Sequence, residues 1–307
     1  MSFMHMSIPA STTPEAFQAE GLVPEIAASV RPAAAWRRLV GHRSALLGMT
    51  VLAVYVVTAV FGPIVFPFTP GQNHLETVLF PPGQGGHLLG TDDFGRDELL
   101  LLVYGSRYTL SLGLMAVALG IAVGVPLGAI SGYSGGWVDI LIQRFTDILL
   151  AFPSIVLALG LVAALGVGLR NVVIAVGVSS VPSFIRLVRA DSLRLRELPF
   201  VEAARALGVS PSRILLRHVI PNAIAPVIVQ ATLQMGFAIL LAASLGFFGL
   251  GVQPPTPEWG ELLGEARNYI FSDPNLATFP GLAIFAAVLA FNLVGDGLRD
   301  ALDPRLA

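Results

Sequence analysis

The residues whose types and spacing favour specific contacts lie between Glu202 and Pro221, in the sequence EAARALGVSPSRILLRHVIP. This stretch is polar and rich in arginine, whereas long apolar runs lie on both sides of it. Arg213 and Arg217 are four residues apart, so they share one face of a helix. The pattern favours binding to another protein and transmission of motion, rather than catalysis.

The rest of the residue inventory argues against an enzyme. The chain has no cysteine, and no lysine is present among its 18 basic residues. The absence of lysine excludes a phosphate-binding loop that ends in Gly-Lys-Ser/Thr, Schiff-base chemistry and lysine nucleophiles. The five histidines are scattered, and none forms the H-x-x-x-H spacing of a metal site. We therefore predict no catalytic residue, no metal site and no cofactor in this chain.

The composition is that of a membrane protein. Hydrophobic residues make up 54% of the chain and charged residues 12%, against about 25% charged residues in soluble domains. A helix of roughly 20 apolar residues crosses the hydrocarbon core of a bilayer. Six segments qualify, so we predict an all-α integral membrane protein with spans at about 44–66, 107–131, 145–166, 171–189, 222–249 and 277–297.

Glycine and proline interrupt several of these predicted spans, for example at Gly120, Gly124, Pro126, Pro153 and Pro182. Membrane helices tolerate such residues, because neighbouring helices satisfy the freed backbone groups. Small residues also allow two helices to approach closely. We therefore expect glycine at helix contacts within the bundle.

Arginine is distributed unevenly between the two sides of the membrane. With six spans and the N-terminus inside, the outer segments hold only Arg96, Arg107, Arg170 and Arg267. The inner segments hold the other fourteen: Arg31, Arg37, Arg38, Arg43, Arg144, Arg186, Arg189, Arg194, Arg196, Arg205, Arg213, Arg217, Arg299 and Arg305. The positive-inside rule therefore places 202–221 in the cytoplasm, as the largest inner loop, together with both chain ends.

The N-terminal region differs from the spans. Residues 1–30 have few aromatic residues and no periodicity, which is typical of a flexible tail. Residues 33–43 favour a short interfacial helix with Trp36 and Leu39 towards lipid. All three tryptophans, Trp36, Trp137 and Trp259, fall at predicted span edges, as expected of interfacial aromatic residues.

Two short helices joined by a sharp turn are predicted within 199–221. Pro199 suits the first position of the first helix, and Gly208 supplies a left-handed stop after it. Ser210 is predicted to cap the second helix, which ends at Pro221. The first helix would have a thin surface that fits a groove, because it contains Ala203, Ala204 and Ala206.

Two other interpretations of this stretch stay open. One is an ordinary solvated loop, which the ordered succession of caps and stops disfavours. The other is a DNA-binding helix-turn-helix, because ARALGVSPSRI has the turn spacing of that motif. A loop held between two membrane spans is a poor candidate for DNA binding, so we expect no nucleic-acid partner.

The stretch resembles the EAA loop of ATP-binding-cassette (ABC) importer permeases. That pattern is E-A-A, three residues, G, nine residues and I-x-L-P, and the chain matches it at Glu202, Ala203, Ala204, Gly208 and Pro221. His218 stands where the pattern has isoleucine, and Ile220 stands where it has leucine. Arginine and histidine before the final Val-Ile-Pro are similar to the variant of dipeptide and oligopeptide permeases.

Three further stretches resemble the same narrower family, and they are His87–Leu112, Phe248–Arg267 and Asn292–Pro304. The first contains the core GTDDFGRD at 90–97, but leucine occupies positions 100 and 101, where the family has Ser-Arg. The resemblance covers roughly 40–307. It points to the second of the two permease subunits of such importers, and it is not specific to a substrate.

The resemblance implies a type I ABC importer permease fold with six transmembrane helices and a cytoplasmic coupling helix. It divides the chain into a tail (1–30), an interfacial segment with the first span (31–66), a periplasmic loop (67–106) and a core permease domain (107–307) with the EAA loop at 200–221. In such importers a second homologous permease completes the path. Two ATPase subunits bind ATP and Mg²⁺, and an extracytoplasmic binding protein delivers substrate at the bacterial inner membrane.

The resemblance also assigns expected roles to residues. Coupling to the ATPase is expected of Glu202, Ala203, Ala204, Arg205, Gly208, Arg213, Arg217 and Pro221. Polar groups at membrane depth are expected to line the path: Ser179, Ser180, Ser183, Gln230, Gln234 and Ser244. Outer carboxylates are expected to guide docking of the binding protein: Asp92, Asp93, Asp97, Glu258, Glu261 and Glu265. For Gly90–Arg96 we favour a structural turn, in which Asp92 or Asp97 pairs with Arg96 or Arg107.

The leading functional prediction is the permease subunit of an ATP-driven importer of dipeptides or oligopeptides. One alternative is an ion-coupled secondary transporter, which would favour acidic groups and broken helices at the midplane. Another is a scaffold or receptor subunit of a membrane complex. The sequence leaves the substrate open among dipeptides, oligopeptides, glutathione and nickel chelates.

Overall fold

The computed structural model describes residues 32–69 and 71–302, so the predicted tail, Arg31 and Arg305 lie outside the described residues. The described residues form helices and no β-strand. The α-helices are α1 (Pro32–Gly41), α2 (Arg43–Val65), α3 (Glu98–Ser134), α4 (Gly136–Leu150), α5 (Ser154–Leu165), α6 (Leu169–Leu195), α7 (Pro199–Ala206), α8 (Pro211–Ile214), α9 (Ile220–Asn222), α10 (Ile224–Phe247), α11 (Trp259–Ala266) and α12 (Asn275–Leu302).

Five described helices, α2, α3, α6, α10 and α12, are long and apolar enough to cross a membrane. The predicted third span at 145–166 is wrong as a single helix, because its residues belong to α4 and α5, which are bent by 89°. Pro153 lies at this break. Proline has no amide hydrogen to donate and clashes with the preceding turn, which favours a break here, although α3 and α6 continue through Pro126 and Pro182. The bent pair is the sixth candidate span.

The closest helix pair is α3 and α6, which run parallel. Glycine occupies every fourth position of α3 from 120 to 132. A β-carbon at Gly124 would lie 2.9 Å from the carbonyl oxygen of Val181, and one at Gly132 would lie 2.5 Å from that of Arg189. The contacts advance in the same direction along both helices. The expectation of glycine at helix contacts is therefore confirmed for this pair.

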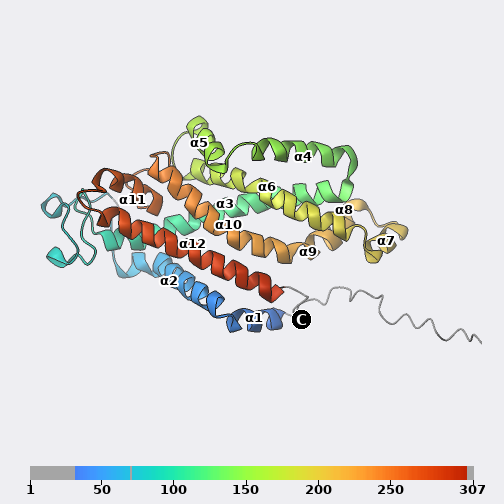
Figure 1. Cartoon of the computed structure of the whole chain (residues 1–307), viewed down its shortest axis with the longest axis horizontal. Coiled ribbons are helices and arrows are strands. Elements are labelled where there is room, and N and C mark those ends of the chain that lie inside the picture. Colours follow the sequence, from blue (N-terminus) through green and yellow to red (C-terminus); the bar gives the residue numbers. More distant parts are fainter. Residues whose placement is uncertain (1–31, 70, 303–307) are drawn as a thin grey trace, which may run out of the picture.

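Because α3 and α6 are parallel, the chain must return from the end of α3 to the start of α6. The bent pair α4–α5 makes this return along the outside of the two helices (Figure 1). Asp147 of α4 accepts a hydrogen bond from Arg186 of α6 at 3.1 Å. This ion pair ties the returning segment to the bundle.

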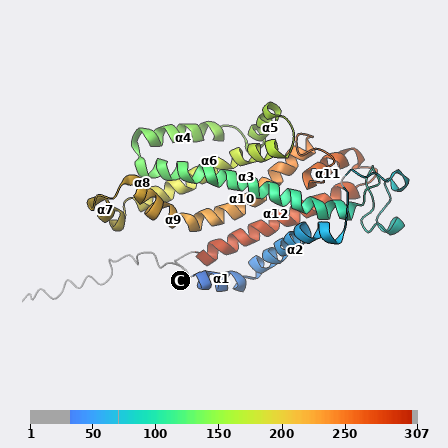
Figure 2. The same ribbon diagram turned by 180° about the vertical axis from the view of Figure 1, so that it is seen from behind.

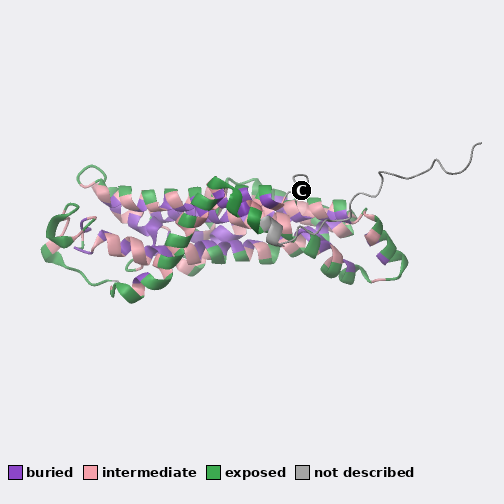
Figure 3. Ribbon diagram, turned by 90° about the horizontal axis from the view of Figure 1, so that it is seen from below, coloured by how far each residue is buried: buried purple, intermediate pink, exposed green. Residues whose placement is uncertain are grey.

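The bundle is elongated, and its loops gather at two opposite ends (Figures 1 and 2). The segment between α2 and α3 lies with α11 at one end, and α7 and α8 lie at the other. We call these the outer end and the inner end, following the arginine distribution. Buried residues follow the long axis between them, whereas α7 is largely exposed (Figure 3).

The second predicted span is longer than expected. The helix α3 begins at Glu98 instead of near Arg107. Asp97 caps it, since its side chain accepts the N–H of Leu100 at 3.1 Å. The same carboxylate lies 2.7 Å from His87 Nδ1, so Asp97 pairs with neither of the arginines considered for it. A helix that starts in the outer loops anchors those loops directly to the membrane core.

Two predictions of lipid-facing side chains are wrong. Trp259 is 1% exposed, and its indole N–H donates to the carbonyl of Leu102 at 3.0 Å. The reason is that α11 folds back against α3, where the ring also packs on Tyr55. Leu39 of α1 is buried against Ala301 at the end of α12, instead of facing lipid. Both side chains therefore join helices together.

Candidate functional site

The first helix of the inner loop is α7. As predicted, proline occupies its first position. The helix ends in a Schellman motif, in which Gly208 N–H donates to Arg205 O at 2.9 Å and Val209 N–H donates to Ala204 O at 3.1 Å. Gly208 has φ +77°, a conformation that glycine reaches without a steric penalty. The predicted left-handed stop is therefore confirmed.

The second helix is longer and less regular than predicted. After α8 the chain passes through a π-helical turn, Leu215–Val219, into α9. The prediction that Pro221 ends the helix is wrong, because this proline lies in the first turn of α9, where no amide hydrogen is required. The chain turns only at Ala223, before α10. Ser210 occupies the cap position but makes no capping bond with its side chain.

The two helices of the inner loop share a small apolar core. Val201 and Ala204 of α7 are buried in one cluster with Ile214. The ring of His218 lies 6.0 Å from the ring of Phe200, so the residue that departs from the family pattern packs against α7. This packing argues against an ordinary solvated loop. The two helices form one unit that can move as a body.

The outward face of α7 is the surface available to a partner. It carries Glu202, Ala203 and Arg205, which are exposed. Leu207 is 83% exposed at the tip of the loop. Ala204 is buried and does not belong to this exposed surface, so its expected role in coupling stays a prediction. Leu207 was not among the predicted contacts, although a large apolar residue before a glycine stop in a polar loop is a signal that identifies it.

The second helix extends this exposed surface. Arg213 and Arg217 are exposed, as is Pro221. Leu216 is a second exposed leucine on the same helix. We call the exposed side chains of both helices the inner face; they are Glu202, Ala203, Arg205, Leu207, Arg213, Leu216 and Arg217. The inner face combines two exposed leucine side chains, Leu207 and Leu216, with a net positive charge.

The inner loop is connected to the bundle by polar contacts. The guanidinium of Arg205 lies 5.2 Å from the ring centre of Tyr133, at the end of α3. Beneath it, Arg189 of α6 donates two hydrogen bonds to Asp139 of α4, at 2.6 and 2.7 Å. These contacts connect α7 to the end of α3, and they hold the ends of α4 and α6 together.

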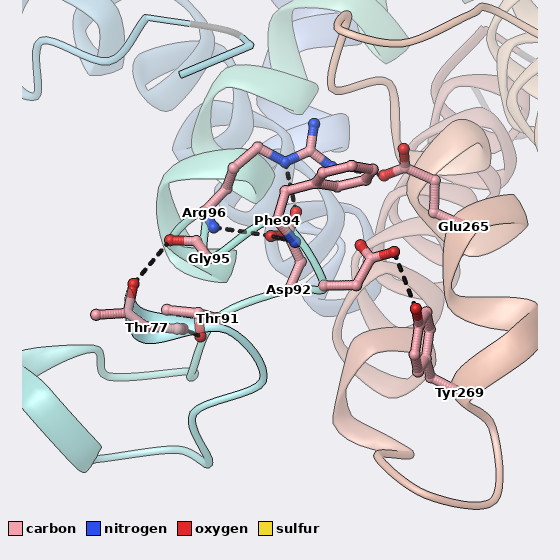
Figure 4. A network of polar contacts seen from close by, with 9 residues as sticks. Thr77, Thr91, Asp92, Phe94, Gly95, Arg96, Glu265 and Tyr269 are labelled. Carbon is pink, nitrogen blue, oxygen red and sulfur yellow. Dashed lines mark hydrogen bonds and ion pairs between the residues drawn. The ribbon is translucent and has the colours of Figure 1, made fainter. Parts of the chain in front are cut away.

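The outer carboxylates hold loops together. Asp92 accepts the N–H groups of Phe94 and Arg96 at 2.9 and 2.7 Å, and it also pairs with the Arg96 guanidinium. Arg96 donates a further bond to Glu265 of α11 at 2.6 Å (Figure 4). Burial raises the pKa of Asp92. The favoured interpretation of Gly90–Arg96 as a structural turn is therefore confirmed.

Two glutamates of α11 are also internal. Glu258 accepts the hydroxyl of Thr109 at 2.8 Å and the N–H of Gly260 at 2.9 Å, which caps α11 and joins it to α3. Burial raises the pKa of Glu258. Burial, together with the Glu265 carboxylate, raises the pKa of Glu261 to about 9. The carboxyl groups of Glu258 and Glu261 therefore lie inside the fold and not on a surface open to a partner.

This burial changes the docking prediction at the outer end. Asp92, Glu258 and Glu261 are buried, so direct contact with a binding protein does not fit them. Asp93 and Glu265 are partly exposed. For these two, a docking role stays a prediction.

The residues predicted to line the path occupy different environments. Ser180 is fully buried against Gly120, so a path-lining role does not fit it. Ser244 lines an open, apolar groove of about 610 Å³ between α10, α11 and α12. Its hydroxyl donates to Leu240 O at 2.8 Å. The path-lining role stays a prediction for Ser179, Ser183, Gln230, Gln234 and Ser244.

The geometry of Gly208 gives a direct test of the inner loop. We expect Gly208→Val to loosen α7, because a β-branched residue at positive φ costs about 1–2 kcal/mol. Gly208→Asn is the matched control, since asparagine adopts this conformation and a β-carbon meets no atom here. Amide hydrogen exchange within 199–209 should accelerate about tenfold for the valine variant only. Equal exchange in both variants would contradict a structural role for the left-handed stop.

Two family models match the chain. Residues 124–307 match the binding-protein-dependent transport system inner membrane component, and residues 33–82 match the N-terminal TM domain of oligopeptide transport permease C. Among solved structures, the inward-facing MetNI methionine ABC transporter is similar, with a TM-score of 0.54 and 21% identity over 67% of this chain and 98% of that chain. This likeness concerns the fold alone, and it agrees with the predicted type I ABC importer permease fold.

Curated relatives are similar over most of their length. The dipeptide transport system permease protein DppC of Alkalihalophilus pseudofirmus is 46% identical over 89% of each chain. The di/tripeptide transport system permease protein DppC of Pseudomonas aeruginosa is 45% identical, covering 88% of this chain and 91% of the relative. The glutathione transport system permease protein GsiD of Pectobacterium atrosepticum is 42% identical, covering 88% and 90%. The chain therefore belongs to the family of binding-protein-dependent transport system inner membrane components, as a multi-span ABC transporter permease.

Proposed function

We propose that this chain is one of two permease subunits of an ATP-driven importer of short peptides. The relatives are named for dipeptides, di/tripeptides and glutathione. Glutathione is itself a tripeptide, so the three names share one chemical class. The second, homologous permease would contribute the other half of the path, as the half-buried polar residues of α6 and α10 require a facing wall.

The observation that carries this proposal is the rigid, exposed helix α7 at the inner end. The chain has no lysine and hence no phosphate-binding loop of its own. We infer that partner ATPase subunits bind ATP and Mg²⁺ and receive α7 in a groove. When these subunits close and reopen, the inner loop would move with them. Its contacts with α3 would carry the motion into the spans, which gives alternating access.

Substrate would be delivered at the outer end of the bundle, opposite α7. An extracytoplasmic binding protein would dock there, on the segment between α2 and α3 and on α11. This orientation requires the inner face, both chain ends and the arginine-rich segments to be cytoplasmic, in the bacterial inner membrane. The opposite placement of the two loop sets in Figure 1 is compatible with it.

The ion-coupled alternative receives no support. The broken helix that it would favour is present as α4–α5, but the break at 151–153 carries no ionisable residue. The carboxylates of α4 pair with arginines of α6 instead. The comparisons also name no ion-coupled carrier among the relatives described above.

Uptake of a radiolabelled dipeptide tests the proposal. The test uses cells that lack both ATP synthase and this chain. We expect dipeptide uptake to return when the chain is expressed in them again. Uptake should stop when ATP is depleted and persist when a protonophore collapses the proton gradient. The opposite pattern would support ion coupling and contradict the proposal. The extent to which glutathione, longer peptides and a nickel chelate each reduce uptake of the labelled dipeptide then ranks them as substrates.

A further inference from the structure

Carboxylates outnumber basic groups at the outer end. Asp92 and Asp93 of the 71–97 segment, Glu98 at the start of α3, and Glu261 and Glu265 of α11 lie around Arg96. Within residues 32–69 and 71–302, Arg96 is the one basic side chain that forms ion pairs with members of this group. The group therefore holds five carboxyl groups for one guanidinium. We call these five residues the acidic cluster.

Two members of the acidic cluster are buried without hydrogen-bond partners. Glu98 is 2% exposed, and its Oε1 has no partner. Glu261 is 5% exposed, and neither of its carboxylate oxygens has a partner. A buried polar group without a partner is costly, and a buried charge is more so. Of the two, Glu98 lines the small cavity between these carboxylates, so its orphaned oxygen is available to a cation bound there.

The geometry fits a single small ion. One oxygen each of Asp92, Asp93 and Glu265 can lie within 4.8 Å of one another. They line a small, partly open cavity of about 10 Å³, as do Glu98 and Tyr269. Tyr269 donates its hydroxyl to Asp93 at 3.1 Å, so this carboxylate is held in place. A cavity of this volume has room for about one water-sized particle.

The chemistry of the donors selects the kind of ion. Every donor is an oxygen, and no nitrogen or sulfur ligand lies in the group. Carboxylate oxygens suit hard cations, and Ca²⁺ accepts six to eight oxygen ligands in flexible geometry. Mg²⁺ requires a near-ideal octahedron of ligands, whereas Ca²⁺ tolerates an irregular arrangement of carboxylates such as this one. Calcium therefore fits the site better than magnesium.

We propose that Asp92, Asp93 and Glu265 bind a Ca²⁺ ion, with Glu98 as a further ligand, and that this ion joins the 71–97 segment to α11. The two segments are far apart in the sequence and meet only at the outer end. A bound ion would fix their relative position where a binding protein would dock. The site would therefore set the rigidity of the outer end and not the chemistry of transport.

Calcium binding by the full chain in lipid nanodiscs tests this proposal. We expect CaCl2 to raise the unfolding temperature relative to EDTA, because an ion that binds only the folded state stabilises it. Asp93→Asn and Glu265→Gln should weaken Ca²⁺ affinity at least tenfold in titration calorimetry. Glu76→Gln is the matched control, since Glu76 is an exposed carboxylate of the same segment, and it should bind as the wild type does.

A second measurement needs no variant. Tb³⁺ replaces Ca²⁺ in oxygen sites, and a tyrosine at the site excites its luminescence. We expect wild-type protein to sensitise Tb³⁺ emission, and Ca²⁺ to remove the signal at concentrations at which Mg²⁺ does not. Absence of emission, no rise in unfolding temperature with Ca²⁺, or equal affinity for Mg²⁺ would each overturn the calcium site.

Discussion

Replacing Leu207 with aspartate is expected to abolish ATP-driven uptake while the chain still folds. Leu207 is 83% exposed, so the isolated subunit loses almost no packing. In a complex, burying this side chain would contribute about 1.5–3 kcal/mol. A carboxylate in its place would have to be desolvated without a partner, which adds to the loss. We expect the yield of co-purified ATPase to fall at least tenfold and peptide uptake to fall with it.

The matched control is Leu75→Asp at the outer end. Leu75 is 76% exposed and belongs to the segment between α2 and α3, which lies at the opposite end of the bundle from α7 (Figure 1). The substitution has the same chemical character, so ATPase co-purification should stay at the wild-type value. If both variants keep the ATPase, α7 is not its docking site. If both lose it, the cause is a general effect on the membrane subunit and the role of Leu207 is not specific.

Gly128→Leu is expected to prevent formation of the folded bundle. A β-carbon at position 128 would lie 2.6 Å from the carbonyl oxygen of Ile185 and 3.0 Å from the β-carbon of Val188. These are backbone and branched-chain atoms, so the two helices must separate. Overpacking of a well-packed contact costs about 1–3 kcal/mol, and a whole leucine side chain belongs at the upper end or beyond. We expect a strong fall in the unfolding temperature or loss of folded protein in detergent.

Gly160→Leu in α5 is the control for this prediction. No atom lies within 4 Å of a β-carbon at Gly160, and the residue is likewise a helical glycine in an apolar segment. Its unfolding temperature should stay close to that of the wild type. Equal destabilisation by both substitutions would mean that the α3–α6 contact is not responsible, since leucine favours a helix more than glycine does.

The sequence was sufficient to predict five of the spans and the first helix of the inner loop. Long apolar runs set the positions of α2, α3, α6, α10 and α12, because the thickness of the bilayer fixes the length of a spanning helix. The stop at Gly208 was predictable, since its geometry depends on neighbouring residues only. Glycine within the predicted spans was likewise expected at helix contacts, although the sequence did not show with which helix.

Features that depend on distant contacts were not predictable. The burial of Trp259 requires α11 to fold back on α3, and the sequence around Trp259 resembles an ordinary span edge. The partition of the outer carboxylates into buried and exposed groups depends on Arg96 reaching Glu265 of another segment. The bend at Pro153 was mistaken for a tolerated proline, because only the parallel arrangement of α3 and α6 shows that α4 and α5 form a return.

The most direct test of the central claim is cross-linking of the inner face to an ATPase subunit. The chain has no cysteine, so Leu207→Cys introduces a single reactive thiol. With a short thiol-reactive cross-linker, this variant should join to the ATPase in the assembled transporter, and the yield should change when ATP is added. Leu75→Cys should give no such product. Failure of Leu207→Cys to reach the ATPase, or an equal yield from Leu75→Cys, would contradict energy coupling through α7.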